Sequence, residues 1–221
     1  MSKSSALIFI SGGGSNLQAF IDAVRDGSLE LDIALVLSNR PDAGGLRRAQ
    51  AAGIETLCVP HTDFADRESF DAALVDTIAP LQPDLIVLAG FMRILGASFV
   101  ARYCGRILNI HPSLLPAYPG LHTHQRAIDA GEKWHGCTVH FVTGELDAGA
   151  AVMQARVPVL PDDDAHTLAA RVLEQEHRIY PRSAALIAAG RLAYRDGHAW
   201  LDGKVLNEPI QFRAPDIHTI L

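Results

Sequence analysis

Residues Ala6-Leu-Ile-Phe-Ile-Ser-Gly-Gly-Gly-Ser-Asn16 join a short apolar run to three consecutive glycines. The run at 6–10 predicts a buried strand. Residues 16–25 then carry apolar side chains at the spacing of an amphipathic helix, namely Leu17, Phe20, Ile21 and Val24. A strand, a glycine loop and a helix in this order present free backbone N–H groups and the positive end of a helix dipole to a phosphate. We therefore predict that this segment opens an α/β fold with an anion-binding loop.

The same alternation continues along the chain. Apolar runs at 33–37, 54–59 and 85–89 predict strands, and segments 46–52 and 66–79 predict helices between them. Strands that are apolar throughout and separated by helices are typical of a parallel sheet covered on both faces. A strand at 106–110, a helix at 123–130, an alternating antiparallel pair at 137–142 and 151–157, and a long helix at 165–189 follow. We expect Asp164 to cap the long helix, and Asp196-Gly197 and Asp202-Gly203 to form hairpin turns. We predict one α/β domain over residues 1–221, whose mostly parallel sheet continues into an antiparallel C-terminal portion.

Composition limits the kinds of partner. Lys and Arg number 19 against 25 Asp and Glu, and the net charge of −6 argues against sequence-independent binding to nucleic acid. The longest apolar stretches are strand-sized and too short to span a membrane. The 3 cysteines lie far apart without a Cys-x-x-Cys pair, which indicates reduced thiols and a cytoplasmic protein. We expect small-molecule substrates, with neither nucleic acid nor a membrane as partner.

The glycine loop differs from the dinucleotide fingerprint Gly-x-Gly-x-x-Gly, because its third position falls on Leu17. The second predicted strand leads into Ser38-Asn39-Arg40, without an acidic residue to hold a ribose diol. The loop therefore favours a single phosphate over a dinucleotide. A tight strand-to-helix turn without a ligand is the alternative.

A second candidate site lies in Asn109-Ile-His-Pro-Ser-Leu-Leu-Pro116, at the end of the strand predicted at 106–110. Strand alternation places Asn109 and His111 on one face, where an amide donor and an imidazole suit oxyanion stabilisation and proton transfer. Asp147, in the turn 143–149, favours the charged imidazole only if it faces His111. The alternatives are an ordinary loop histidine and ordinary turn chemistry.

Other polar residues give weaker indications. Of the 10 histidines, His122 and His124 lie close together in sequence, but no carboxylate or thiol stands at ligand spacing, so no metal site is expected. Glu174 and Glu176 are most simply solvated residues of the long helix. The sequence contains no Gly-x-Ser-x-Gly nucleophile elbow.

Four segments together point to a known family: residues 10–18, 88–95, 109–124 and 139–147. The sequence resembles the folate-dependent formyltransferases from about residue 6 to residue 202, with the motifs in the family's order and spacing. The element from Asn109 to Pro116 is shared by all members that use 10-formyltetrahydrofolate. The glycine loop and Pro119-Gly-Leu-His-Thr-His124 point to the phosphoribosylglycinamide branch.

The resemblance implies a Rossmann-like fold and transfer of a formyl group from the co-substrate 10-formyltetrahydrofolate to the amino group of phosphoribosylglycinamide, in purine synthesis. It implies a phosphate-binding half at 1–100 and a catalytic and folate-binding half at 101–221. The catalytic group would be Asn109, His111 and Asp147. The phosphate and ribose would be held by Gly13, Gly14, Ser15, Asn16 and Glu176. The folate would contact Arg67, Met92, Arg93, Ile94, Leu95, Asn109, Thr143, Gly144, Glu145, Leu146 and Asp147, with Arg67 toward its benzoyl-glutamate tail.

Two positions depart from the family pattern, since Gly13 stands where a polar residue is usual and Ala148 where a glycine is common. Methionyl-tRNA formyltransferase adds a basic domain to this catalytic element, and formyltetrahydrofolate deformylase adds a regulatory one; we expect neither here. A non-catalytic phosphosugar-binding module is the alternative from another class. A monomer and a homodimer both fit the sequence.

Overall fold

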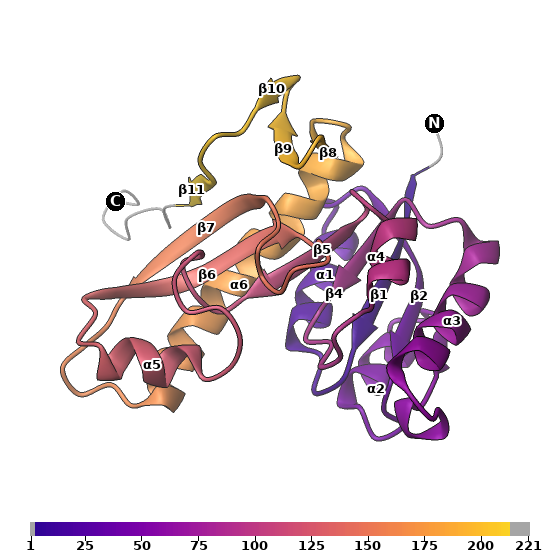
Figure 1. Ribbon diagram of the computed structural model, residues 1–221, viewed down its shortest axis with the longest axis horizontal. Coiled ribbons are helices and arrows are strands. Elements are labelled where there is room, and N and C mark those ends of the chain that lie inside the picture. Colours follow the sequence, from indigo (N-terminus) through magenta and orange to yellow (C-terminus); the bar gives the residue numbers. More distant parts are fainter. Residues whose placement is uncertain (1–2, 213–221) are drawn as a thin grey trace.

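The computed structural model describes residues 3–212, so residues 1–2 and 213–221 of the predicted domain lie outside the described part. Eight strands form the main sheet in the order β11-β7-β6-β5-β4-β1-β2-β3 (Figure 1). The parallel strands are β1 (Ser4–Ile10), β2 (Leu31–Ser38), β3 (Thr56–Cys58), β4 (Leu85–Leu88) and β5 (Ile107–His111). β6 (Trp134–Phe141) runs antiparallel to β5, and β7 (Ala151–Pro158) antiparallel to β6. The predicted parallel sheet with an antiparallel continuation is confirmed.

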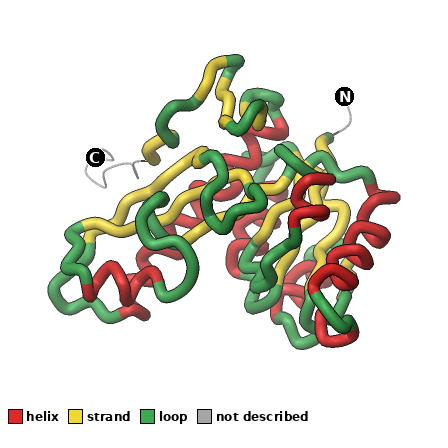
Figure 2. The backbone as a smooth tube through the Cα atoms, viewed as in Figure 1, coloured by secondary structure: helices red, strands yellow, loops and turns green. Residues whose placement is uncertain are grey.

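Helices cover both faces of the sheet, as the apolar strands require. α1 (Ser15–Arg25), α2 (Gly44–Ala51) and α6 (Ala165–Ala188) pack on one face, while α3 (Arg67–Ile78) and α4 (Ala97–Arg102) pack on the other (Figures 1 and 2). β1 alternates between the two cores: Ala6, Ile8 and Ile10 face the first, and Leu7 and Phe9 the second. α5 (Thr123–Asp129) lies against α6, and single turns of 3-10 helix occupy His61–Asp63 and Ala79–Leu81.

Capping boxes begin two of the helices. Asp66 accepts from the backbone N–H of Ser69 before α3, and Asp164 accepts from that of Thr167 before α6. Each side chain satisfies one of the N–H groups that a helix leaves free at its start. The predicted cap at Asp164 is confirmed, and the cap at Asp66 holds Arg67 at the first position of α3.

A small antiparallel sheet follows α6, formed by β8 (Leu192–Arg195), β9 (His198–Leu201) and β10 (Lys204–Val205). Its two turns are Asp196-Gly197 and Asp202-Gly203, and all four residues have positive φ, of 50°, 81°, 50° and 79°. Positive φ at both central residues is the signature of tight hairpin turns, so both predicted hairpins are confirmed.

The sequence pattern predicts neither α4 nor β11. α4 has 6 residues, too few for a helical period to stand out. β11 (Ile210–Phe212) pairs in parallel with β7, more than 50 residues earlier in the chain, and has only 3 residues. In the described part of the chain, no helix is both long and apolar enough to cross a membrane.

The close approach at the end of the β6–β7 connection gives a prediction of stability. Gly149→Ala should lower the free energy of unfolding by about 1–3 kcal/mol, because its Cβ would overlap the Phe141 carbonyl and force the strand pair apart. We expect Tm to fall by about 2–4 °C for each kcal/mol, measured by calorimetry. Gly144→Ala in the same turn is the control, since its Cβ would meet nothing within 4 Å. Equal Tm values for the two variants would contradict the close approach.

Candidate active site

The antiparallel register of β5 and β6 sets the centre of the site. Asn109 lies opposite His140, and His111 lies opposite Thr138. Asn109 and His111 are two residues apart at the carboxyl end of β5, so both side chains lie on the same face of the sheet. The register also brings the turn after β6, which contains Asp147, back over the end of β5.

His140 orients the amide of Asn109. Burial lowers the pKa of His140, which keeps the imidazole neutral. Its Nδ1 lies 2.9 Å from the Phe141 carbonyl and donates to it, so its Nε2 carries the lone pair. Nε2 accepts from Asn109 Nδ2 at 3.1 Å. One amide hydrogen is thereby engaged, and the other remains available to a ligand. Local sequence does not single out His140, because a histidine in a buried strand resembles any core histidine with satisfied hydrogen bonds.

The structure brings His111 and Asp147 together. His111 Nδ1 lies 3.4 Å from Asp147 Oδ2, and both side chains are less than a tenth exposed. On the other side of the ring, Nε2 lies 2.9 Å from the Tyr118 carbonyl and donates to it. A protonated His111 can therefore donate from both nitrogens to acceptors that are already in place, which holds the ring in one orientation.

The Asp147 turn is held from several sides. Oδ2 accepts from the Gly120 backbone N–H at 2.9 Å, and Oδ1 lies 3.8 Å from His140 Nε2. Asp147 has a φ of 53°, a left-handed conformation that aspartate adopts more readily than most residues. Ala148 is not among the positive-φ residues, so an alanine fits where the family often has glycine. Gly149 carries the steric requirement of this turn instead.

The glycine loop is built by two backbones in close contact. Gly14, with a φ of 74°, caps α1, and a Cβ there would lie 2.6 Å from Gly45 Cα. The Gly45 backbone N–H donates to the Gly12 carbonyl at 3.0 Å. A Cβ at Gly13 would meet nothing within 4 Å, so the polar side chain usual in the family would have open space.

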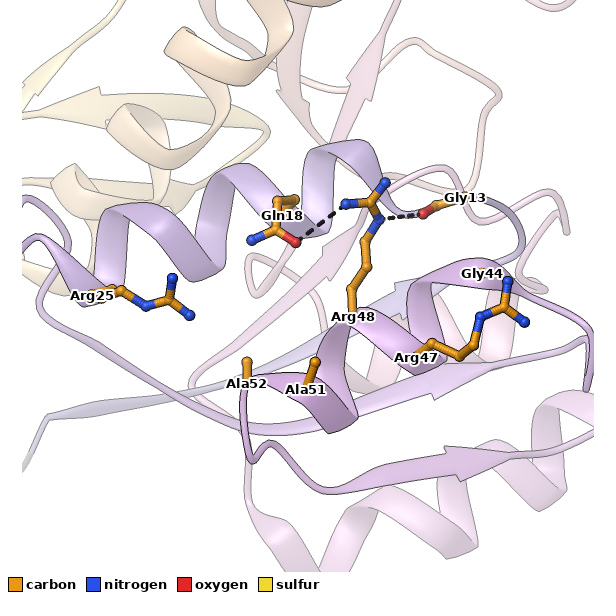
Figure 3. A pocket seen from close by; sticks show the side chains of 8 residues that line it. All are labelled: Gly13, Gln18, Arg25, Gly44, Arg47, Arg48, Ala51 and Ala52. Carbon is orange, nitrogen blue, oxygen red and sulfur yellow. Dashed lines mark hydrogen bonds between the residues drawn. The ribbon is translucent and has the colours of Figure 1, made fainter.

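Arg48 braces this loop from the side of α2, as Figure 3 shows. Its Nε donates to the Gly13 carbonyl at 2.8 Å, and its Nη1 donates to Gln18 Oε1 at 3.3 Å (Figure 3). In a trans peptide the C=O and the next N–H point in opposite directions. With the Gly13 carbonyl turned toward Arg48, the Gly14 N–H therefore points away from the Arg48 side. Local sequence does not single out Arg48, because it lies 35 residues from Gly13.

Asn16 and Glu176 meet across 160 residues of sequence. Asn16 Nδ2 donates to Glu176 Oε2 at 2.8 Å, and burial raises the pKa of Glu176. Asn16 Oδ1 is buried and has no hydrogen-bond partner among the residues that the structure describes. The simple prediction that Glu176 is a solvated residue is wrong, because α6 turns this side chain toward α1; Glu174 is exposed as predicted. Glu176 thus belongs to the neighbourhood of the glycine loop, and Ser15 starts α1 there.

Apart from Asn109 in β5, the residues assigned to the folate by resemblance lie in loops and at a helix start. Met92, Arg93, Ile94 and Leu95 follow β4, the neighbour of β5, and Arg67 is exposed at the start of α3. Met92 and Ile94 are 71% and 60% exposed, and Leu146 in the turn 143–147 is 56% exposed. Thr143, Gly144 and Glu145 complete that turn. Large apolar side chains left in solvent within loops beside a polar cluster are typical of a ligand surface.

Comparison with known proteins now identifies the family. The family model described as formyl transferase matches residues 5–184. The chain belongs to the formyl transferase family. It is 50% identical over 210 residues to phosphoribosylglycinamide formyltransferase of Escherichia coli K12, covering 95% of this chain and 98% of the relative. It is 49% identical over 199 residues to the Haemophilus influenzae protein of the same name, covering 90% and 94%.

Solved structures of formyltransferases agree in fold. A phosphoribosylglycinamide formyltransferase from Coxiella burnetii, solved with CHES, superposes with a TM-score of 0.91 at 50% identity and covers 96% of this chain and 100% of its own. These comparisons confirm the resemblance drawn from the sequence, the predicted fold class and the predicted class of enzyme, a formyltransferase.

This formyltransferase also holds a pair of histidines behind His111. His135 Nε2 lies 3.2 Å from His124 Nδ1, with the Tyr118 ring packed against His135. Burial is the main cause that lowers the pKa of His135 to about 4, and the neighbouring His124 adds to it. Among residues 3–212, no group of three His, Cys, Asp or Glu side chains is placed to hold a metal.

The His135 shift predicts how stability depends on pH. In the unfolded chain a histidine titrates near 6.5, so between pH 6.5 and pH 4 the unfolded chain binds a proton that the folded enzyme does not. Stability is thus full above pH 6.5 and falls as pH drops toward 4, by up to about 3 kcal/mol from this residue. His135→Leu should flatten the plot of Tm against pH in this window. His198→Gln, at an exposed hairpin position, should leave the slope unchanged. A full slope in His135→Leu would contradict the assignment.

Proposed function

We propose that this enzyme transfers the formyl group of 10-formyltetrahydrofolate to the amino group of phosphoribosylglycinamide, in purine synthesis. The products are formylglycinamide ribonucleotide and tetrahydrofolate. The proposal rests on the grouping of Asn109, His111 and Asp147: the first two lie at the end of β5, and Asp147 lies in the turn that packs over it. Relatives in this family are named phosphoribosylglycinamide formyltransferase.

Attack of the substrate amine on the formyl carbon creates a tetrahedral intermediate with a negative oxygen. The free amide hydrogen of Asn109 is oriented by His140 and is available to donate to that oxygen. A protonated His111 supplies the second donor when Nε2 exchanges the Tyr118 carbonyl for the formyl oxygen. Donors that are fixed before the reaction stabilise the developing charge without reorganising at the moment of reaction.

Asp147 balances and orients the imidazole. Its carboxylate lies 3.4 Å from Nδ1 and holds the charged ring in place while Nε2 serves the substrate. The attacking amine must lose a proton and the departing folate nitrogen must gain one. His111, or a water held by Asp147, would carry that proton.

The substrate phosphate would lie at the glycine loop, on backbone N–H groups of Gly13, Gly14, Ser15 and Asn16 and on the dipole of α1. Glu176, bound to Asn16, would accept from the ribose hydroxyls. The folate would lie across Met92, Arg93, Ile94, Leu95 and the turn Thr143–Asp147, with Arg67 toward the tail. We further propose the division into a phosphate-binding half at 1–100 and a catalytic half at 101–221, and a cytoplasmic location.

One assay tests the proposal against its alternatives. The purified protein is mixed with 10-formyltetrahydrofolate, with and without phosphoribosylglycinamide, and formation of tetrahydrofolate is followed. We expect turnover only when both are present. Turnover without the acceptor would indicate a hydrolase, and none in either case a binding module.

Removing the charge of Asp147 should impair catalysis rather than binding. Asp147→Asn is suited to this test, because asparagine tolerates the left-handed backbone and its oxygen can still accept from Gly120. We expect kcat to fall about a hundredfold or more, with much smaller changes in both KM values. His111→Ala should be comparably slow, and the double variant far less than multiplicatively slower, because the two act as one unit. Full activity in Asp147→Asn would leave Asp147 as an ordinary turn residue.

A further inference from the structure

The hydroxyl of Ser11 joins three segments at the carboxyl edge of the sheet. Ser11 follows β1 directly, and its side chain is 5% exposed. Its Oγ lies 2.5 Å from Asn39 Oδ1 and 2.7 Å from the backbone nitrogen of Met92. Asn39 follows β2. Met92 is the first residue of the segment 92–95 after β4, which we propose contacts the folate and call the folate loop. One buried hydroxyl therefore contacts the connections after β1, β2 and β4.

The direction of each hydrogen bond follows from Asn39. Its Oδ1 faces Ser11, and its Nδ2 lies 3.1 Å from His61 Nδ1, a ring nitrogen that is also 3.1 Å from the Asn39 backbone carbonyl. That oxygen can only accept, so the Ser11 hydroxyl donates to it. The lone pairs of Ser11 Oγ are then left to accept from the Met92 N–H. Asn39 is 2% exposed, so water does not readily replace either partner.

The backbone on both sides supports the same contact. The Ser11 N–H donates to the Gly90 carbonyl at 3.1 Å, extending the pairing of β1 with β4 by one step. Gly90 then has a φ of 76°, which turns the chain toward Met92 and ends the ladder. After Gly90 the Met92 N–H donates to the Ser11 hydroxyl instead of to the backbone of β1. Ser11 directly precedes Gly12, where the glycine loop begins.

We propose that Ser11, oriented by Asn39, is a positioning residue that holds the folate loop, through Met92, in a fixed position relative to the glycine loop. The two substrates react only when the amine and the formyl carbon are held at bonding distance, so the relative position of these loops matters for the reaction. The proposal rests on the proposed function for the identity of the two loops. The contact itself, through Ser11, Asn39 and Met92, stands independently of that function.

Ser11→Ala is the direct test, read first without any substrate. Loss of the hydroxyl leaves the Met92 N–H without its acceptor, which favours local opening. We expect hydrogen exchange at the Met92 amide to accelerate about tenfold or more. Ser183→Ala is the matched control: this serine is also buried, but its hydroxyl donates to Ile179 within α6. The control should leave Met92 exchange unchanged.

Kinetics then separate positioning from a general loss of stability. In Ser11→Ala we expect the KM for 10-formyltetrahydrofolate to rise about tenfold and the KM for phosphoribosylglycinamide to change by no more than about twofold. Asn39→Leu should produce the same pattern, and the double variant should add little to either single change. If Ser11→Ala fails to fold, Ser11→Cys keeps a weaker acceptor and should give a smaller rise.

The outcomes distinguish this inference from the proposed function. Unchanged Met92 exchange in Ser11→Ala, or equal rises in both KM values, would overturn the positioning role while the wild-type activity stands. Faster exchange in a protein whose wild type transfers no formyl group would support the contact and reject the proposed reaction.

Discussion

The antiparallel pairing of β5 with β6 is the constraint on which the site depends. Its register places His140 opposite Asn109 and carries the following turn back to His111. Side chains on a strand alternate between faces, so a slip of one residue would turn His140 away from Asn109 and Asp147 away from its partner. The antiparallel pairing of β6 with β5 therefore gathers four polar side chains at the end of one strand, namely Asn109, His111, His140 and Asp147.

Burial decides how these polar groups behave. His140 is kept neutral by its surroundings and can accept from Asn109, whereas an exposed histidine would be free to titrate and turn. Glu176 shows the same effect beside the glycine loop, since burial raises its pKa and Asn16 donates a hydrogen bond to it. Buried polar groups tolerate few arrangements, because an unpaired one is costly, and both groups of side chains are thereby held in fixed positions.

The glycine loop shows a different kind of constraint, which is steric. Gly14 and Gly45 touch backbone to backbone, so neither position has room for a side chain. This contact brings the start of α2 beside the start of α1, and Arg48 then reaches the Gly13 carbonyl. Ser11 and Asn39, which follow β1 and β2, connect the glycine loop to the loop after β4. These contacts hold the glycine loop and the loop after β4 in fixed positions relative to each other.

Local sequence was sufficient for the strand-and-helix order, the glycine loop, the cap at Asp164 and the Asp-Gly hairpins, because short-range periodicity and φ preferences determine these features. It also placed Asn109 and His111 on one face. Tertiary structure alone decided that His140 orients Asn109, that Asp147 meets His111, and that Glu176 is buried against Asn16. The partners in these three pairs are 31, 36 and 160 residues apart in the sequence. Strand register and helix packing set such meetings, and neither is written in local residue preferences.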